Sequence, residues 1–387
     1  MKKILWLPGW YPNKIEPFSG DFIQRHAKAV SLYNAVQVIH VLRDKQGIIT
    51  KNVKEEHFQN ENLKEKTIYY YTPVFFMPFL DKIISNNRYT RLYRKAIEEY
   101  IHAEGLPACV HVHVVNKNGL LALWLKRKYN ILFFISEHWT IYLPNAVPNY
   151  KNFNFFFRAM WRRIVKAAEG FSVVSDCLGE ALIQIQKDIR FTVIPNVIDD
   201  TIFFPAEKKE EGLARFIHIS GLDYQKNPAA IFEAFAMVKK ENPAFVLSVF
   251  GPCEKKLREV VVHLGLQQHV VFYNEVPQPQ LAIYMQQSDA LILYSRYETF
   301  GCVLIEANAC GVPAIVSDLP VFHEIIEEGK NGYFVPGENP GALARKIIWF
   351  ISQSRTISGK AIARTAIEKY NFEKVGKLFN ELYNTLS

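Results

Sequence analysis

The sequence predicts an α/β protein made of two Rossmann-like domains, each built around a parallel sheet. Short apolar runs rich in β-branched and aromatic residues alternate with helical patterns along the chain, as in parallel α/β folds. The alternation occurs twice, once in each half of the sequence. The chain has 387 residues, 49% of them hydrophobic and 22% charged, which is typical of a globular protein long enough for two domains.

The first domain is predicted over residues 1–195. Buried parallel strands read as continuous apolar runs, because both faces of the sheet are covered. We expect strands at Ile4–Leu7, Val36–Leu42, Val110–Val115, Ile131–Ser136, Phe171–Val174 and Thr192–Ile194. Helical spacing of apolar residues predicts one helix behind an N-cap at Ser19 or Asp21 and another over Leu120–Lys128.

The second domain is predicted over residues 196–370, after a linker near residues 193–212 that holds two prolines and a charged run. Its expected strands are Phe216–Ser220, Phe245–Phe250, Val270–Phe272, Ala290–Leu293 and Ala314–Val316. Its expected helices are Pro228–Glu241, Lys255–Leu264, Gln278–Gln287, Gly301–Ala309 and Gly341–Ser352. A further helix is expected near Glu373–Thr385.

Composition narrows the class of protein. No apolar stretch is long enough for a membrane-spanning helix, and Pro8, Gly9 and Pro12 interrupt the first apolar run too early for a signal peptide. The five cysteines are scattered and form no CxxC pair, as expected for free thiols in a reducing compartment. We therefore expect a cytoplasmic protein.

Charge is divided unevenly between the halves. Residues 1–195 carry a net charge of +11 and residues 196–387 a net charge of −3. Basic and aromatic residues interleave in Tyr69–Lys95 and Tyr150–Ala168. These segments fit either core-facing stripes with a solvated basic face, or a surface that contacts an anionic membrane or a lipid-linked acceptor. Nucleic-acid binding would explain the charge but not the glutamates described next.

Two glutamates stand out in "SRYETFGCVLIEANACGVPAIVS", Ser295–Ser317. Glu298 follows a predicted strand directly, whereas Glu306 lies inside an apolar helix, where a bare carboxylate costs several kcal/mol. A ribose diol could donate to Glu306, and the amides of the helix start could bind a diphosphate. Alternatively, Glu298 is a residue favoured by the helix dipole and Glu306 is tied to a buried arginine. Spacing alone does not decide between these readings.

Other candidate ligand contacts also follow predicted strands, where ligands bind in open α/β sheets. Lys226 lies between a strand and a helix that begins at Pro228, which suits either a phosphate contact or a solvated loop lysine. Gly20 precedes a helix, where a side chain would block close approach of a ligand. His138 follows a buried strand and fits either a substrate hydroxyl or a structural role.

A metal site is not predicted. His111 and His113 alternate along a strand, but no third ligand is near them in the sequence. No Asp-x-Asp pair is present to hold a divalent ion on a diphosphate.

Taken in order, these motifs resemble a known family. "WYPNKIEPFSGDFIQRHAKAV", "SEHW", "VIPNVID", "HISGLDYQKN" and "ETFGCVLIEANACGVPAIVS" are similar in order and spacing to the retaining GT-B glycosyltransferases of family 4. The similarity covers nearly the whole chain. It implies a GT-B fold, with a first domain that binds the acceptor, a second that binds a nucleotide-sugar donor, and a C-terminal helix within residues 371–387 that packs back on the first domain.

The resemblance also implies roles for individual residues. Glu298 would contact the transferred sugar, Glu306 the ribose of the nucleotide, and Lys226 the diphosphate. His138 would hydrogen-bond the donor sugar, and Gly20 would let the backbone approach the phosphate or the acceptor.

Further contacts would come from the backbone. The amides of Thr299, Phe300 and Gly301 would assist Lys226, so that no metal or cofactor is required. The segment Phe272–Val276, which includes Asn274, would border the base of a UDP- or GDP-linked sugar.

One position departs from the family pattern. An arginine usually stands five residues before the lysine, and here Gly221 occupies that place.

The function that the resemblance implies is transfer of a sugar from a nucleotide diphosphate to a saccharide or lipid-linked acceptor, in synthesis of a cell-surface polysaccharide or glycan. A non-catalytic nucleotide-sugar-binding subunit, a sugar-nucleotide epimerase and a phosphorylase remain alternatives.

Overall fold

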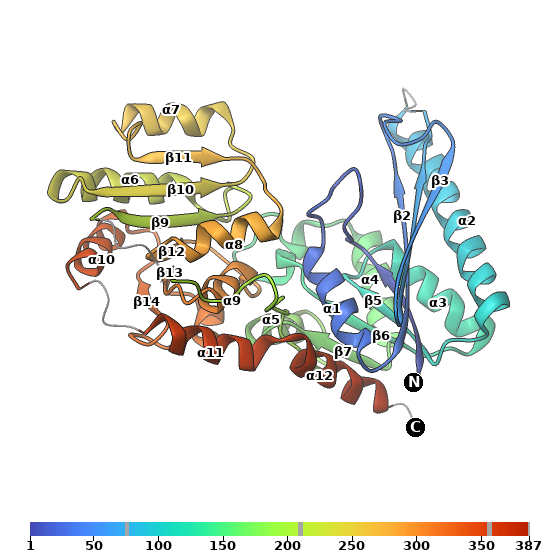
Figure 1. Cartoon of the computed structure of the whole chain (residues 1–387). Helices are drawn as coiled ribbons and strands as arrows, with labels where there is room; N and C mark the ends of the chain where they lie inside the picture. The colour runs from blue at the N-terminus through green and yellow to red at the C-terminus, as the bar shows by residue number, and fades with distance from the viewer. Residues whose placement is uncertain (74–76, 208–211, 354–357, 386–387) are drawn as a thin grey trace.

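Two sheets, one in each half of the chain, form the centres of two domains in the computed structural model, which describes residues 1–73, 77–207, 212–353 and 358–385 (Figure 1). Residues 74–76 of the first aromatic segment, 208–211 of the expected linker and 386–387 at the C-terminus lie outside the described residues. The predicted α/β class with two Rossmann-like domains is confirmed.

Eight strands of the described residues form the first sheet. They are β1 (Lys3–Pro8), β2 (Ala35–Arg43), β3 (Val53–Asn60), β4 (Leu63–Tyr70), β5 (Cys109–His113), β6 (Phe133–Glu137), β7 (Gly170–Val173) and β8 (Phe191–Val193), in the spatial order β3-β4-β2-β1-β5-β6-β7-β8. All neighbouring pairs are parallel except β3 with β4.

Helices cover both faces of this sheet. They are α1 (Asp21–Ser31), α2 (Pro78–Glu104), α3 (Lys117–Tyr129), α4 (Phe155–Ala167) and α5 (Asp176–Ile185), with short 3-10 turns at Thr140–Tyr142 and Tyr150–Asn152. Residues alternate between the faces along β1: Leu5 packs in the cluster that contains residues of α2, α3 and α4, whereas Trp6 packs with residues of α1. The central strands β1, β5 and β6 are buried on both faces for this reason.

Six strands of the described residues form the second sheet, all of them parallel. They are β9 (Ala214–Ile219), β10 (Phe245–Phe250), β11 (Val270–Tyr273), β12 (Ala290–Leu293), β13 (Ala314–Ser317) and β14 (Gly332–Val335), in the order β11-β10-β9-β12-β13-β14. The helices are α6 (Pro228–Glu241), α7 (Lys255–His263), α8 (Gln278–Gln286), α9 (Cys302–Ala309), α10 (Pro340–Ser352) and α11 (Gly359–Tyr370), with a 3-10 turn at Pro320–Glu324.

The last helix, α12 (Phe372–Asn384), leaves the second domain and packs against α1 of the first (Figure 1). Val375, Phe379 and Tyr383 are buried in the same cluster as Trp6 of β1. The Lys2 ammonium donates to the carbonyl oxygen of Tyr383 at 2.7 Å. The C-terminal helix thus ties the end of the chain to the first domain.

Strand order determines where a ligand site can form. In each sheet the order reverses direction, between β1 and β5 in the first and between β9 and β12 in the second. Open α/β sheets bind ligands at such reversals, outside the carboxyl ends of the strands. The loop after β9 holds Gly221 and Lys226, and the loop after β12 holds Glu298.

Candidate active site

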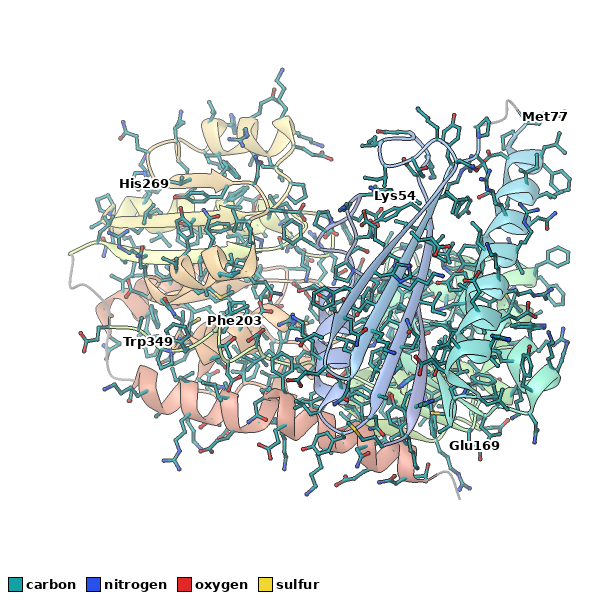
Figure 2. All side chains as sticks on the ribbon, turned by 45° about the vertical axis from the view of Figure 1, so that its right-hand side comes forward. Lys54, Met77, Glu169, Phe203, His269 and Trp349 are labelled. Atoms are coloured by element: carbon teal, nitrogen blue, oxygen red, sulfur yellow. The ribbon has the colours of Figure 1, made fainter. Side chains whose placement is uncertain are left out.

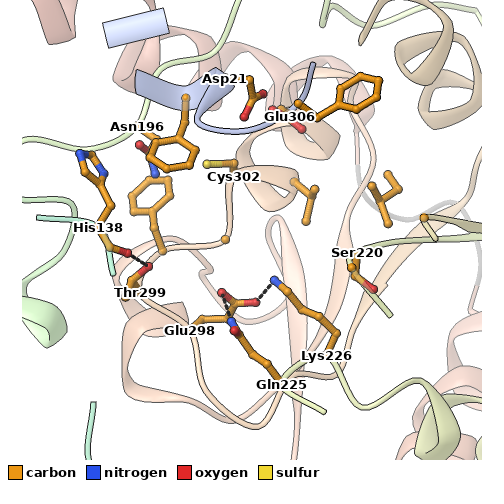
Figure 3. A pocket seen from close by; sticks show the side chains of 18 of the residues that line it. Asp21, His138, Asn196, Ser220, Gln225, Lys226, Glu298, Thr299, Cys302 and Glu306 are labelled. Atoms are coloured by element: carbon orange, nitrogen blue, oxygen red, sulfur yellow. Dashed lines mark hydrogen bonds and ion pairs between the residues drawn. The ribbon is translucent and has the colours of Figure 1, made fainter. Parts of the chain in front are cut away.

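A cleft of about 540 Å³ separates the two domains and is lined by residues of both (Figure 3). Among its lining residues are Trp10, Asp21, Arg25, His138, Gly221, Lys226, Glu298, Thr299, Phe300, Gly301, Cys302 and Glu306. Most of the candidate residues therefore lie in one cavity, although they come from the loops after β6, β9 and β12 and from helix α9.

Glu298 lies in the second domain at the entrance to α9, with 6% of its surface exposed. The Lys226 ammonium donates to one oxygen of its carboxylate, and Gln225 donates to the other at 3.1 Å (Figure 3). The Ser295 hydroxyl also donates to this carboxylate, at 3.0 Å. Glu298 and Lys226 thus form an ion pair that lines the cleft, so a donor diphosphate would have to share or replace the lysine's contact.

The start of α9 lies next to this pair. Gly301 precedes the helix with φ of 92°, a left-handed conformation that favours glycine, and no side chain caps the helix. Gly301, Cys302 and Val303 all line the cleft. Uncapped amides at a helix start form a site for an anion, so this point suits a phosphate.

The loop before α9 is fixed by the first domain. The Thr299 hydroxyl donates to the carbonyl oxygen of His138 at 3.1 Å (Figure 3). The Ser175 hydroxyl donates to the carbonyl oxygen of Thr299 at 2.7 Å. These two hydrogen bonds join the two domains. They fix the position of His138 relative to the start of α9.

Glu306 is paired with Arg25 in this structure. The Arg25 guanidinium donates to its carboxylate at 2.7 Å, and the two residues are only 3% and 4% exposed. Burial raises the pKa of Glu306, and the charge of Arg25 acts in the opposite direction. Of the two readings of Glu306, the buried arginine partner is the one that this structure shows.

Asp21 and Gln278 extend this contact across the cleft. Asp21 of α1 accepts from Arg25 at 3.3 Å and from Gln278 of α8 at 2.7 Å. Asp21 and Arg25 stand at i and i+4 on one helix, a spacing that indicates an ion pair. Their partners in the second domain are more than 250 residues away, and no sequence pattern connects them.

His138 follows β6 and lines the cleft from the first domain. Its carbonyl is held by Thr299, and its ring Nε2 faces Nδ1 of His113 at 3.4 Å. Burial lowers the pKa of His138 well below its ordinary value, with further lowering by His26 and His111. The ring is therefore neutral at physiological pH and can exchange hydrogen bonds with a substrate hydroxyl.

Three histidines lie together here, which the sequence did not predict. His26, His113 and His138 each offer a ligand atom within 4.8 Å of the others, and all three are buried. The rings of His113 and His138 are inclined by 19° with centroids 5.7 Å apart, so their nearest nitrogens face each other along the line between the rings. This direct approach fits an N–H···N contact between neutral imidazoles better than two ligands converging on an ion.

Glu137, next to His138, has a structural role. Its carboxylate accepts from the amide of Val115 at 2.7 Å and from the hydroxyl of Tyr142 at 3.0 Å. Burial raises its pKa to about 7, although these hydrogen bonds favour the ionised form. Glu137 thus joins the loops that follow β5 and β6 and supports the position of His138.

Of the three further candidates Gly20, Gly221 and Asn274, Gly221 is the one that lines the cleft among the described residues. A Cβ on Gly20 would stand 2.6 Å from the backbone of Trp10, so packing already requires a glycine there, independently of any ligand. Gly221 lines the cleft, and a Cβ there would meet only Asp223, at 3.6 Å or more. Among the described residues, Asn274 does not line the cleft, whereas its neighbour Glu275 does.

Two family models match this chain, one over each half. The family model described as "Glycosyltransferase Family 4" matches residues 35–202, and the model described as "Glycosyl transferases group 1" matches residues 199–371. The arrangement of two Rossmann-like domains across a cleft is the GT-B fold. The chain belongs to the GT-B glycosyltransferases of family 4, as the motifs indicated.

Among curated relatives, the chain is 29% identical over 213 residues to the N-acetyl-alpha-D-glucosaminyl L-malate synthase of Bacillus anthracis, covering 52% of this chain and 55% of that one. It is 25% identical over 294 residues to the alpha-monoglucosyldiacylglycerol synthase of Streptococcus pneumoniae, covering 71% of this chain and 65% of that one. The chain thus covers 55% of the length of the first of these relatives and 65% of the length of the second.

Solved structures agree with the fold over the whole chain. Sucrose-phosphate synthase from Thermosynechococcus elongatus superposes with a TM-score of 0.75 at 17% identity, covering 100% of this chain and 99% of that one. HepE of Anabaena, solved in complex with UDP and glucose, superposes with a TM-score of 0.71 at 16% identity, covering both chains completely.

Proposed function

We propose that the protein is a retaining glycosyltransferase that moves a sugar from a nucleoside diphosphate to a saccharide or lipid-linked acceptor, in synthesis of a cell-surface polysaccharide or glycan. The observation that carries this proposal is the meeting of Lys226, Glu298 and the uncapped start of α9 in one interdomain cleft. A cation and free amides suit a diphosphate, and a carboxylate beside them suits sugar hydroxyls.

The reaction follows from these groups. The bond between the anomeric carbon and the diphosphate oxygen breaks, and the acceptor oxygen bonds to that carbon on the same face. Lys226 and the amides of α9 stabilise the negative charge on the leaving diphosphate, and its oxygen takes the acceptor proton. Glu298 orients the sugar and does not attack it. His138 holds a hydroxyl of the donor sugar from the opposite domain.

The donor is proposed to be UDP- or GDP-linked. HepE, which shares the fold, was solved with UDP and glucose, and the two curated relatives are named for an N-acetylglucosaminyl and a glucosyl product. In the proposed reaction, side chains and backbone amides that line the cleft make all the contacts to the donor. The proposed reaction therefore requires no metal or cofactor.

Substitution of Lys226 and Glu298 tests the proposal. We expect Lys226→Ala and Glu298→Ala each to lower kcat/KM by about 100-fold or more, since each removes a charged contact made to the reacting groups. Lys239→Ala is the matched control, because this lysine lies in the last turn of α6 and, among the described residues, bonds only to the carbonyl of Gly265. Unchanged kcat/KM in both cleft variants would contradict the assignment.

Product analysis separates the alternatives. A transferase releases free nucleoside diphosphate and a glycosylated acceptor, an epimerase returns an altered nucleotide sugar, and a phosphorylase yields a sugar phosphate. Binding of a nucleotide sugar without its consumption, in any mixture of acceptors, would favour the non-catalytic subunit.

We also propose that the first domain contacts an anionic membrane, at the inner face of the cytoplasmic membrane. No described helix combines the length and apolarity that crossing a bilayer requires. The first turns of α2 instead expose Phe79, Leu80 and Ile83, and α4 exposes Phe155 and Phe156 at 70% and 82%. Figure 2 shows Met77, just before α2, at the outer edge of the domain.

Basic residues accompany these apolar side chains. Lys82, Arg91, Arg94 and Lys95 are exposed on α2, and Arg162, Arg163 and Lys166 are exposed on α4. Apolar side chains beside exposed cations match the interface of a bilayer that contains anionic lipids. Both helices begin at the carboxyl edge of the sheet, the edge that faces the cleft, so this surface would bring a lipid-linked acceptor near the site.

Vesicle binding tests this surface. We expect the protein to sediment with phosphatidylglycerol-containing vesicles at low salt, and to bind about 10-fold less in Phe155→Ser/Phe156→Ser or at 0.5 M salt, because both insertion and attraction are needed. Exposed Trp349 of the second domain provides the control Trp349→Ser. Equal binding to neutral vesicles, or none at low salt, would contradict the proposal.

A further inference from the structure

Arg25 reaches from the first domain into the part of the second domain where a nucleotide would lie. It stands on α1, whereas its main partner Glu306 stands on α9, and the two form the buried pair at 2.7 Å described above. Arginine is buried only when its charge is compensated, so a buried arginine that reaches from one domain to the other calls for an explanation.

The guanidinium keeps unused donors. It donates to Glu306 and to Asp21, but its Nε has no hydrogen-bond partner among the described residues although it is shielded from solvent. A buried donor without a partner costs free energy, and Arg25 lines the cleft. The side chain therefore has hydrogen-bonding capacity left for a ligand in that cavity.

The start of α9 lies beside this guanidinium. Figure 3 shows Cys302, the first residue of α9, between the Asp21–Glu306 group and the Lys226–Glu298 group. Burial raises the pKa of the Cys302 thiol, and Arg25 acts against that rise, so the charge of Arg25 reaches the first turn of α9. This turn is the proposed diphosphate site.

The second domain has one cation fewer at this site than the family pattern provides. Gly221 stands at the arginine position, and Lys226 is already paired with Glu298. A doubly charged diphosphate held by one lysine and backbone amides would be incompletely neutralised. The position of Arg25 matches this deficit.

We infer that Arg25 supplies the second phosphate-binding cation, from the opposite domain. In this structure it pairs with Glu306. When the donor enters, ribose hydroxyls donate to Glu306 in its place, and the guanidinium turns to the diphosphate. The inference rests on the proposed function and assigns the nucleotide contact to a residue of the first domain. It makes donor binding a contact that joins both domains.

The test compares ligands with and without phosphates. Titration calorimetry measures the dissociation constants of UDP, uridine, GDP and guanosine for the wild type and for Arg25→Gln, which keeps a donor for Glu306 but loses the charge. The nucleoside diphosphate that binds the wild type should bind Arg25→Gln about 10- to 100-fold more weakly, while its nucleoside changes by less than about 3-fold. Arg25→Lys should retain most of the preference for the diphosphate.

Arg43→Gln is the matched control. Arg43 forms a charged pair with Asp81 at 2.6 Å in the same domain but does not line the cleft, so its loss should leave both constants unchanged. Thermal melting checks that each variant is folded.

Gly221→Arg provides a rescue. A side chain fits at this position, and the new arginine would stand where the family places one. In the Arg25→Gln background it should restore diphosphate affinity to within about 3-fold of the wild type.

The outcomes are separable. Equal weakening of nucleoside and diphosphate by Arg25→Gln would show that Arg25 only orients Glu306, and would overturn the inference alone. An unchanged diphosphate constant would do the same. Failure of the wild type to bind either diphosphate would contradict the proposed function and, with it, this inference.

Discussion

Gly20 is required by packing, although ligand binding was the expected reason for a glycine at this position. Its φ of 69° is in the left-handed region, and a Cβ would stand 2.6 Å from the carbonyl carbon of Trp10. Both features disfavour any side chain, and the second involves backbone atoms that cannot rotate away. The glycine therefore sets the approach of the loop after β1 to the start of α1.

Gly20→Ala should lower the free energy of unfolding by about 1–3 kcal/mol, since it adds both backbone strain and a clash. Urea denaturation followed by fluorescence measures this loss. Gly337→Ala is the control, because no atom lies within 4 Å of a Cβ there and its φ is unrestrictive. A stability equal to the wild type in Gly20→Ala would show that the loop can move, and that the glycine is not required by packing.

At the same scale, the sequence predicted some site residues and not others, for a physical reason. Glu298 and Lys226 each follow a strand, and the carboxyl ends of parallel strands meet at one edge, so their proximity could be expected. Arg25 could not be linked to Glu306, because that contact depends on how the two domains face each other. Of the segment expected to border the base, Glu275 and Val276 line the cleft, whereas the contact expected of Asn274 stays a prediction.

At the scale of elements, α12 is held to the first domain by a close approach of two helices. Gly376 of α12 lies against α1, where a Cβ would stand 2.2 Å from the carbonyl oxygen of Ala29. Helix propensity alone would favour alanine at this position. The contact with the backbone of Ala29 has the opposite effect and requires glycine.

Gly376→Ala should therefore lower the melting temperature, by the several degrees that a cost of about 1–3 kcal/mol implies. Differential scanning calorimetry measures the change. Lys377→Ala, an exposed position on the same helix, should leave it unchanged. A gain in stability for Gly376→Ala, as propensity predicts, would mean that α12 does not approach α1 this closely.

Most elements of the second sheet were predicted, and β10, β12 and α6 agree with the expected residues at both ends. Their strands are buried on both faces and therefore carry an unbroken apolar signal. The hairpin of β3 and β4 was missed because β3 is largely exposed, and its sequence VKEEHFQN lacks that signal. The same strand makes the only antiparallel pair among the described residues. The first sheet was expected to be parallel throughout, and this pair is the exception.

At the scale of the whole molecule, burial of histidine gives the fold a marked dependence on pH. Burial lowers the pKa of His26 and His218 to about 4 and that of His111 to about 3, from an ordinary value of 6.5. The pKa values of further buried histidines are lowered for the same reason, to about 4 for His40 and well below the ordinary value for His113 and His138. All of these rings are neutral in the folded protein at physiological pH.

The sign of the effect follows from proton binding. Below about pH 6.5 the unfolded chain binds protons on these rings and the folded protein does not, so stability falls as the pH falls toward 4, by about 1.4 kcal/mol per pH unit for each proton. Glu137 acts in the opposite direction, because its raised pKa of about 7 means that the folded state holds a proton that the unfolded state has lost. The histidines outnumber it, so the net effect is acid lability.

We therefore expect the free energy of unfolding to be similar at pH 8 and 7 and to drop by several kcal/mol between pH 6.5 and 5.5, as measured by urea denaturation at fixed ionic strength. His40→Gln tests the cause at a position that does not line the interdomain cleft, and should reduce the drop by about 1 kcal/mol. Stability that is constant or rises from pH 7 to 5.5 would contradict the burial of neutral histidines. Because His26 and His138 lie beside the cleft, loss of the fold and loss of the site should occur together as the pH falls.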